Sequence, residues 1–232
     1  MLPKVVTFDC AETLVRVKWT PGGFAVQCAA AIGISVEDEE RLAYEQLLRS
    51  RWTRYQQVNE TRDPQKGDQF WHELSEDWLM SIGQPKSLAP AMMQAAPDLL
   101  YGDESDLFTL YDDVLPTLKA LDELGIRIGV ISNWDYSLHR VLRSLNIHDR
   151  FEHVIASLEE GWEKPDPRLF QRTLEKFAVT PEQAVHVGDN PLDDLRGAQD
   201  FGMKAFLIDR AHEHSRGTIL ARLTDLVPAL ER

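Results

Sequence analysis

The chain has 232 residues, of which 43% are hydrophobic, enough for a buried core in one large domain or in a core with a small inserted domain. Lysine and arginine total 25 against 38 aspartates and glutamates, a formal net charge of −13 at pH 7. So acidic a surface repels nucleic acid and anionic membranes, and we expect neither as a partner. An anionic substrate would need a local basic residue or a metal ion.

The cysteine count and the N-terminal segment favour an intracellular location. Two cysteines, Cys10 and Cys28, do not make a disulfide framework. Lys4 and Asp9 interrupt the N-terminal apolar run, and no apolar run reaches the length of a membrane-spanning helix. We therefore expect a cytoplasmic protein, a monomer or a homodimer.

The first strand and a long helical segment follow one another along the chain. Residues 5–8 are short, apolar and β-branched, which predicts a buried strand. Residues 16–105 then contain no convincing strand, and a helix is expected over about 39–59. Large apolar residues recur at helical spacing in two stretches: Tyr44, Leu48, Trp52 and Tyr55, then Phe70, Leu74, Trp78 and Ile82. These stripes favour bundle core over a ligand cage, although a substrate contact stays open for some of the aromatic residues.

Strands and helices alternate in the remainder of the chain. Further strands are predicted at 126–131, 153–156, 184–187 and 204–208, with helices between them and a closing helix at 219–227 that Pro228 would stop. Such alternation indicates a parallel sheet covered on both faces. We therefore predict an α/β fold with a Rossmann-like parallel sheet core, residues 1–15 plus 106–232, and an inserted α-helical bundle, residues 16–105.

Polar residues stand where the predicted strands end. Asp9 follows the first strand, Ser132 and Asn133 the second, and Asp189 the fourth, while Lys164 lies in a turn before a helix. Ligands of open α/β sheets bind at the carboxyl ends of the strands, so these residues are expected to converge. Two neighbouring carboxylates repel one another without a cation, and oxygen ligands suit Mg²⁺. Ser132 and the amides after Asp9 would then hold a phosphoryl group.

Four segments carry a family resemblance. They are 8–14 (FDCAETL), 130–133 (VISN), 163–167 (EKPDP) with Phe170 following, and 187–198 (VGDNPLDDLRGA). In this order they resemble the four motifs of the haloacid dehalogenase-like hydrolase superfamily, in the subgroup with a helical cap inserted after motif one. Each motif alone is a weak signal, whereas four in order over the whole chain are a strong one.

The resemblance implies a role for each matching residue. Asp9 resembles the nucleophile that forms an aspartyl-phosphate, with Ser132 and Lys164 as its catalytic partners. The implied Mg²⁺ ligands are Asp9, the carbonyl of Ala11, and Asp189. The implied phosphate-binding residues are Cys10, Ala11, Ser132, Asn133 and Lys164. Around them, Thr13 would buttress the first loop, and Asp194 would pair with Lys164 or with metal-bound water, with Asp193 as an adjacent competitor.

One position departs from the phosphatase pattern. The second aspartate, two residues after the nucleophile and used as general acid and base, is here Ala11. General acid–base help contributes about 10²–10⁴-fold to a rate, so we expect slow turnover, with hydrolysis of the aspartyl-phosphate affected most. Glu12 is the neighbouring carboxylate that would have to replace it.

These features leave three functions open. The first is a Mg²⁺-dependent phosphatase that acts on a small phosphorylated metabolite. The second is another reaction on the same scaffold. Asp189 argues against the halide-cleaving branch, and the absence of a lysine in the expected helix 39–59 argues against the phosphonate-cleaving branch. The third is a non-catalytic binding protein that keeps the fold and the metal site.

Overall fold

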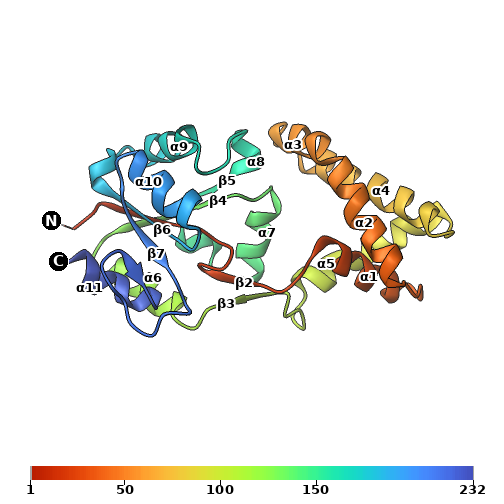
Figure 1. The fold of residues 1–232 in the computed structure, drawn as a ribbon, viewed down its shortest axis with the longest axis horizontal. Helices are drawn as coiled ribbons and strands as arrows, with labels where there is room; N and C mark the ends of the chain where they lie inside the picture. Colours follow the sequence, from red (N-terminus) through yellow and green to blue (C-terminus); the bar gives the residue numbers. More distant parts are fainter. Residues whose placement is uncertain (1, 232) are drawn as a thin grey trace. The chain divides into compact units, whose positions relative to one another are not determined.

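The computed structural model describes residues 2–231, which form two compact units (Figure 1). The first unit comprises Met1–Val17 and Thr109–Arg232, and the second comprises Lys18–Phe108. The chain therefore leaves the first unit once and returns to it. The sequence-based insertion, 16–105, begins two residues earlier (16 against 18) and ends three residues earlier (105 against 108).

A six-stranded sheet forms the centre of the first unit, in the order β5-β4-β1-β6-β7-β8, with every neighbouring pair parallel. The strands are β1 (Val5–Phe8), β4 (Arg127–Ser132), β5 (His153–Ala156), β6 (Ala184–Gly188), β7 (Lys204–Ile208) and β8 (Ile219–Leu220). The chain adds β4 and β5 on one side of β1 and β6 to β8 on the other. The order of the strands thus reverses between β1 and β6, where open α/β sheets form their ligand crevice.

Helices cover both faces of this sheet. Helices α9 and α10 pack on one another, as do α6 and α11, and the two pairs lie on opposite sides of the strands in Figure 1. Every residue of β1 and β6 is consequently buried, as continuous apolar strands of a doubly covered sheet should be. The helical elements are α6 (Val114–Glu123), α7 (Ser137–Ser144), η2 (His148–Arg150), α8 (Ser157–Glu160), α9 (Pro167–Phe177), η3 (Pro181–Gln183), η4 (Pro191–Arg196), α10 (Gly197–Asp200), η5 (Leu223–Asp225) and α11 (Leu226–Leu230). The predicted Rossmann-like α/β fold is confirmed.

The predicted closing helix at 219–227 is wrong. Ile219 and Leu220 instead extend the sheet as β8, paired with Leu207 and Ile208 of β7. Strand pairing at the sheet edge overrides the local helical pattern here. Helix α11 begins only at Leu226, and Pro228 lies in its first turn, where the missing N–H has no helical partner to lose.

The second unit is helical: α1 (Pro21–Ala31), α2 (Asp38–Ser50), α3 (Trp52–Glu60), α4 (Pro64–Ser81), η1 (Lys86–Leu88) and α5 (Ala89–Tyr101). The single helix predicted over 39–59 is two helices that meet at Arg51. Trp78 is fully buried and packs edge-on against Tyr44, with ring centroids 5.4 Å apart. Most of the aromatic stripe is therefore core, except Trp52, which is 43% exposed. Among residues 2–231 no helix has both the length and the apolar character needed to cross a bilayer.

The prediction of no strand in the inserted segment 16–105 is wrong at its beginning, where strand β2 (Val15–Val17) includes residues 16 and 17; the partner strand β3 (Phe108–Leu110) follows the predicted segment. Strand β2 pairs with β3 in a two-stranded sheet. Each strand has three residues, too few to show a period of two in the sequence, so the pairing comes from the return of the chain.

Candidate active site

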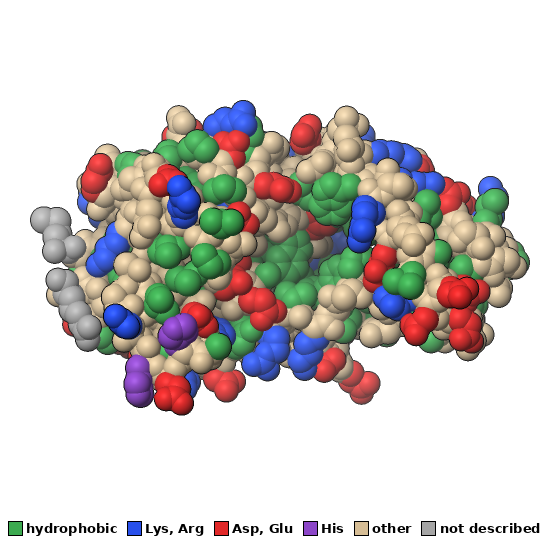
Figure 2. Space-filling view, in the orientation of Figure 1, with side chains coloured by type: hydrophobic (Ala, Val, Ile, Leu, Met, Phe, Trp, Pro, Cys, Tyr) green, Lys and Arg blue, Asp and Glu red, His purple; other side chains and the backbone are tan. Residues whose placement is uncertain are grey.

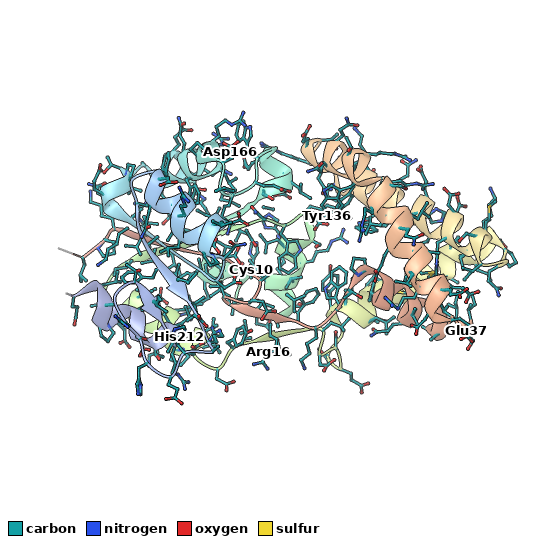
Figure 3. All side chains as sticks on the ribbon, in the orientation of Figure 1. Cys10, Arg16, Glu37, Tyr136, Asp166 and His212 are labelled. Atoms are coloured by element: carbon teal, nitrogen blue, oxygen red, sulfur yellow. The ribbon has the colours of Figure 1, made fainter. Side chains whose placement is uncertain are left out.

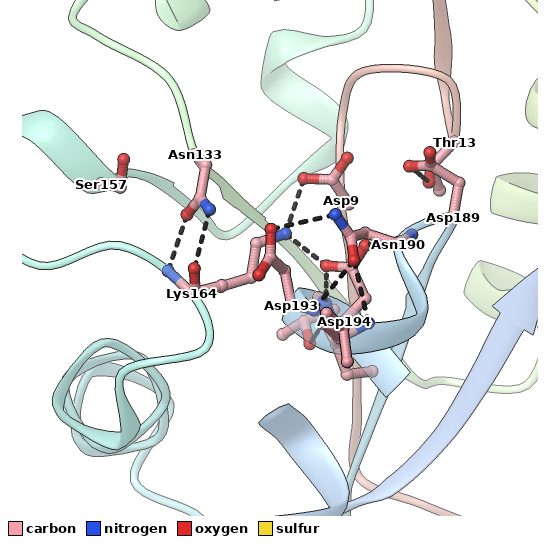
Figure 4. A network of polar contacts seen from close by, with 12 residues as sticks. Asp9, Thr13, Asn133, Ser157, Lys164, Asp189, Asn190, Asp193 and Asp194 are labelled. Atoms are coloured by element: carbon pink, nitrogen blue, oxygen red, sulfur yellow. Dashed lines mark hydrogen bonds and ion pairs between the residues drawn. The ribbon is translucent and has the colours of Figure 1, made fainter. Parts of the chain in front are cut away.

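Residues from the ends of three adjacent strands meet at one place (Figure 4). Asp9 follows β1, Ser132 ends β4, and Asp189 follows β6. Asp9, Asp189 and Asp194 each offer a carboxylate oxygen, and the three oxygens lie within 4.8 Å of one another. Side chains 180 positions apart in the chain thus come together because β1 and β6 are parallel neighbours with Val5 beside Ala184.

Lys164 supplies the positive charge of this cluster. Its Nζ donates to Asp9 Oδ1 at 2.6 Å and to Asp194 Oδ1 at 2.5 Å, with the lysine only 4% exposed. Burial alone would lower the pKa of Lys164, but the two carboxylates raise it above its ordinary value, so the group stays an ammonium. The Asn133 amide fixes its main chain, donating to the Lys164 carbonyl at 2.9 Å and accepting from its N–H at 2.7 Å.

Asp194 is the most firmly held acid of the cluster. One oxygen accepts from Lys164 and lies 3.0 Å from His186 Nε2, and the other accepts from the Asn190 N–H at 2.9 Å. Burial would raise its pKa, but Lys164 and the bond with His186 bring the pKa well below the ordinary value. Gly188 makes the room, because a Cβ there would lie 2.1 Å from Asp194 Cγ.

The two adjacent acids after β6 differ in surroundings. Asn190 caps the π-helix η4, accepting from the N–H groups of Leu192 and Asp193. The Asp193 side chain accepts from Asn190 Nδ2 at 3.0 Å and is half-buried. Asp194, by contrast, is 1% exposed and contacts Lys164, so the structure brings Asp194 and not Asp193 to the lysine.

The crowded carboxylates favour a bound cation. Burial raises the pKa of Asp9, with Lys164 opposing and Asp194 adding to the rise, and a hydrogen bond from Ser132 lowers it again. Burial and then the charges of Asp9 and Asp194 raise the pKa of Asp189 to about 6. Three carboxylates share one ammonium, an excess of negative charge that a divalent ion offsets. Carboxylate oxygens are the donors that Mg²⁺ takes, so the donor set fits this ion.

The loop after β1 is a tight turn that brings Cys10 and Ala11 beside Asp9. The Cys10 carbonyl accepts from the N–H groups of Leu14 and Val15, both at 2.9 Å. Figure 3 labels Cys10 at this loop, where burial and then the Asp9 charge raise the pKa of its thiol well above the ordinary value. A thiol that stays protonated is a poor nucleophile and a poor metal ligand.

Glu12 directs its carboxylate to other partners. One oxygen accepts from the Val17 N–H at 3.0 Å and the other from the Tyr111 hydroxyl at 2.5 Å. Its φ of +54° is in the left-handed region, which turns the chain immediately after Ala11. Glu12 thus braces the loop to β2 and to the segment after β3, and neither bond brings its carboxylate to Asp9.

Thr13 ties the loop to the end of β6. Its hydroxyl donates to Asp189 Oδ1 at 3.2 Å, and its carbonyl accepts from Arg210 Nη2 at 2.7 Å. Arg210 also donates to the buried Asp113 at 2.8 Å. Sequence reasoning gave no role to Arg210, which follows the fifth predicted strand and carries no local pattern that points to the first loop.

His186 and Thr7 are two further residues that the sequence patterns did not single out. His186 is fully buried in β6, with its ring nitrogens 2.9 Å from Thr7 Oγ1 and 3.0 Å from Asp194 Oδ1. A signal did exist, because a histidine inside an otherwise apolar strand must find hydrogen-bond partners when buried.

Acidic residues outnumber basic ones in this chain, 38 against 25. Figure 2 shows acidic and basic side chains interspersed over the visible face. Against the net charge of −13, the ammonium of Lys164 is a local positive charge at this site for an anionic ligand.

Comparison with known proteins agrees with the geometry. A model of the haloacid dehalogenase-like hydrolase family matches residues 3–202. The chain belongs to this hydrolase family. It is 31% identical to haloacid dehalogenase-like hydrolase domain-containing protein 3 of Mus musculus, over 98% of this chain and 94% of that protein. It is 35% identical to the glyceraldehyde 3-phosphate phosphatase of Methanopyrus kandleri, over 52% of each chain.

A solved structure extends the comparison to the whole fold. The crystal structure of a 2-haloacid dehalogenase from Pseudomonas syringae superposes with a TM-score of 0.67 at 25% identity, over 100% of this chain and 99% of that chain. The hydrolase family thus includes relatives of this chain named for phosphate and for halide chemistry, and the residues of the site must decide between them.

Proposed function

We propose that this protein is a Mg²⁺-dependent phosphatase that hydrolyses a small phosphorylated metabolite through an aspartyl-phosphate on Asp9. The observation that carries the proposal is the convergence of Asp9, Asp189 and Asp194 around Lys164. Similarity to a glyceraldehyde 3-phosphate phosphatase over half of the chain supports the phosphate chemistry. We further assign the first unit as the hydrolase core and Lys18–Phe108 as the cap of a cytoplasmic enzyme, monomeric or homodimeric.

In this proposal the residues of the chain share the phosphoryl transfer. Asp9 attacks phosphorus with one carboxylate oxygen while the bond from phosphorus to the leaving oxygen breaks, and the electron pair leaves with that oxygen. Lys164 and Ser132 hold the phosphoryl oxygens, and the amides of Cys10 and Ala11 add donors. Asp9, the Ala11 carbonyl and Asp189 would hold Mg²⁺, which supplies electrophilic stabilisation of the phosphoryl group. Water then attacks phosphorus, and the bond to Asp9 breaks to regenerate the carboxylate.

The surroundings of Ala11 support slow turnover. Its methyl group cannot donate a proton to the leaving oxygen or accept one from water. Glu12 is engaged with Val17 and Tyr111, and Lys164 with Asp9 and Asp194. Esters with a weakly basic leaving group, which departs without protonation, should therefore be the better substrates, with the second half-reaction rate-limiting.

A panel of phosphate esters that includes p-nitrophenyl phosphate tests the proposal. We expect phosphate release with Mg²⁺ and its loss when EDTA removes the metal. Rapid mixing at high enzyme concentration should show a burst of p-nitrophenolate, because Asp9 is phosphorylated faster than it is hydrolysed. The absence of turnover and of any burst would refute the phosphatase assignment and favour a binding protein.

The haloacid dehalogenase neighbour makes halide cleavage the second candidate. That reaction displaces a halide with a carboxylate and leaves no phosphoryl charge to neutralise. Asp189 and Asp194 beside Asp9 argue against it, because two extra carboxylates repel a 2-haloacid unless a cation offsets them. Halide release from 2-haloacids in EDTA, with no activity on phosphate esters, would favour this candidate instead.

A further inference from the structure

His186 lies in β6 and contacts Thr7 of β1 and Asp194 of the segment after β6 with its two ring nitrogens. The side chain is fully buried, and its ring lies edge-on to Phe170 with centroids 5.5 Å apart. Removing an imidazole from water costs free energy unless its nitrogens are hydrogen-bonded. Nδ1 lies 2.9 Å from Thr7 Oγ1, and Nε2 lies 3.0 Å from Asp194 Oδ1.

The partners assign the proton positions. An ionised carboxylate only accepts hydrogen bonds, so Nε2 carries the proton that is donated to Asp194. In a neutral ring Nδ1 then accepts from the Thr7 hydroxyl, whose alternative acceptor, the Val185 carbonyl, is farther away at 3.3 Å. Thr7 stands directly beside His186 in the β1–β6 pairing, so the sheet itself fixes this contact.

These hydrogen bonds form a closed chain, called the circuit below, that begins at Thr7 in β1 and ends at Asp9 directly after this strand. It runs from Thr7 to His186, Asp194 and Lys164, and returns to Asp9, two residues after Thr7. Each bond of the circuit is 3.0 Å or shorter. Since Thr7 lies in β1 and Asp9 directly follows this strand, a change in the position of His186 would be taken up by Asp194 and Lys164.

We propose that His186 is a positioning residue, which through its Nε2–H fixes the Asp194 carboxylate and thereby holds the Lys164 ammonium against Asp9. This inference rests on the proposed function, which gives Asp9 and Lys164 their catalytic roles. His186 itself touches no reacting atom. Gly188, two residues later on the same face of β6, lets Asp194 lie directly over the strand, within reach of the imidazole.

Two substitutions at position 186 separate the hydrogen bond from the packing. His186→Gln keeps an N–H donor at about the reach of Nε2, whereas His186→Leu fills the space without a donor. We expect kcat/KM for p-nitrophenyl phosphate with Mg²⁺ to fall about 10–100-fold in His186→Leu, the range seen when partners that orient catalytic groups are removed. His186→Gln should stay closer to the wild type than to the leucine variant.

Thr7→Val tests the other end of the ring, and Thr173→Val is its matched control. Thr173 is equally buried, but its hydroxyl donates to the Leu169 carbonyl within α9, away from the circuit. We expect Thr7→Val to lower turnover and Thr173→Val to leave it unchanged, with a similar loss of thermal stability in both.

Three results would overturn the inference. One is a folded His186→Leu protein with the turnover of the glutamine variant, and another is equal turnover in the two valine variants. The third is a nitrogen-15 spectrum of the histidine rings that places the His186 proton on Nδ1 instead of Nε2. If the wild type turns over no ester, the proposed function fails separately. The affinity of the same variants for inorganic phosphate with Mg²⁺, measured by calorimetry, then tests the role of His186. His186→Leu should bind more weakly than His186→Gln, and Thr7→Val more weakly than Thr173→Val.

Discussion

The loops that follow β1 and β6 both present aspartates to the site, but they are built differently. After β1, Asp9 is followed by Cys10 and Ala11, whose side chains give no acid or base near neutral pH. After β6, Asp194 is fixed by three donors, Lys164, His186 and the Asn190 N–H. The first loop thus carries the proposed nucleophile without a neighbouring acid or base of its own, whereas the second carries a carboxylate that is held by several hydrogen bonds.

Because of this difference, substitutions in the two loops should have different effects. The Ala11 side chain makes no hydrogen bond, so a substitution there removes none from the fold. Any change at Asp194, in contrast, leaves buried donors without a partner, which costs free energy. Substitutions in the first loop should therefore change rates, and substitutions in the second should change stability as well.

The largest effect is expected at the nucleophile. Asp9→Asn should lower the turnover of p-nitrophenyl phosphate about 10⁴-fold or more, because the amide cannot form the covalent intermediate. Steady-state kinetics with Mg²⁺ measure it. The control is Asp200→Asn, which removes an exposed carboxylate in α10 and should leave the rate unchanged. An Asp9→Asn protein with a tenth of the wild-type rate would exclude Asp9 as the nucleophile.

Ala11→Asp should have the opposite effect. The new carboxyl group would stand two residues after Asp9 and accept a proton from the water that hydrolyses the aspartyl-phosphate, so kcat for p-nitrophenyl phosphate should rise about 10²–10⁴-fold. Alkyl phosphates, whose leaving oxygen needs a proton, should gain in the first half-reaction as well. Ala11→Asn has the same size without the acid and serves as the control. Equal rates in the aspartate and asparagine variants would show that the missing acid does not limit the enzyme.

The sequence predicts some parts of the fold better than others. Strands such as β5 and β7 match their predicted ranges because a buried parallel strand is a short apolar run, a property of the local sequence. The pairing of β8 with β7 and the exposure of Trp52 depend on distant segments, and the sequence patterns missed both.

In the candidate site too, the sequence predicts the positions of residues better than the contacts between their side chains. Asp9, Ser132, Lys164 and Asp189 stand at predicted strand ends or turns, and the topology of the sheet is enough to bring them together. The lysine bond to Asp194, the commitment of Glu12 to Tyr111 and the bond of His186 to Asp194 are set by side-chain packing across the sheet. No spacing in the sequence encodes these contacts. The family resemblance implied the first of them, the pairing of Asp194 with Lys164, and the structure identifies the other two.

Asp194→Asn should affect stability as well as rate. Removing one partner of a buried ion pair typically costs about 3–5 kcal/mol, and the remaining bond from Lys164 to Asp9 places this variant near the low end. Urea denaturation should therefore give a free energy of unfolding lower by about 3 kcal/mol, with reduced turnover. The half-buried Asp193→Asn is the matched control and should lose much less stability. Equal losses in both variants would contradict the distinction between the two acids.

The smallest effect is expected at Asp189, and it has the opposite sign for stability. Its pKa in the folded protein is about 6, above the ordinary value of 3.8, so the charged form is less favourable in the fold than in the unfolded chain. The stability that this group contributes is full below about pH 4 and is lost as the pH rises through about 6.

In EDTA at pH 7, Asp189→Asn should therefore melt about 2–4 °C above the wild type for each kcal/mol of relieved repulsion, and the difference should vanish at pH 4. Circular dichroism melting curves at both pH values measure this difference. Mg²⁺ should reverse the order of the two proteins at pH 7, because a bound cation stabilises only the folded state and Asp189 is one of its proposed ligands. A wild type that stays the more stable protein in EDTA would mean that the carboxylates do not repel one another, and the argument for a cation between them would lose its electrostatic basis.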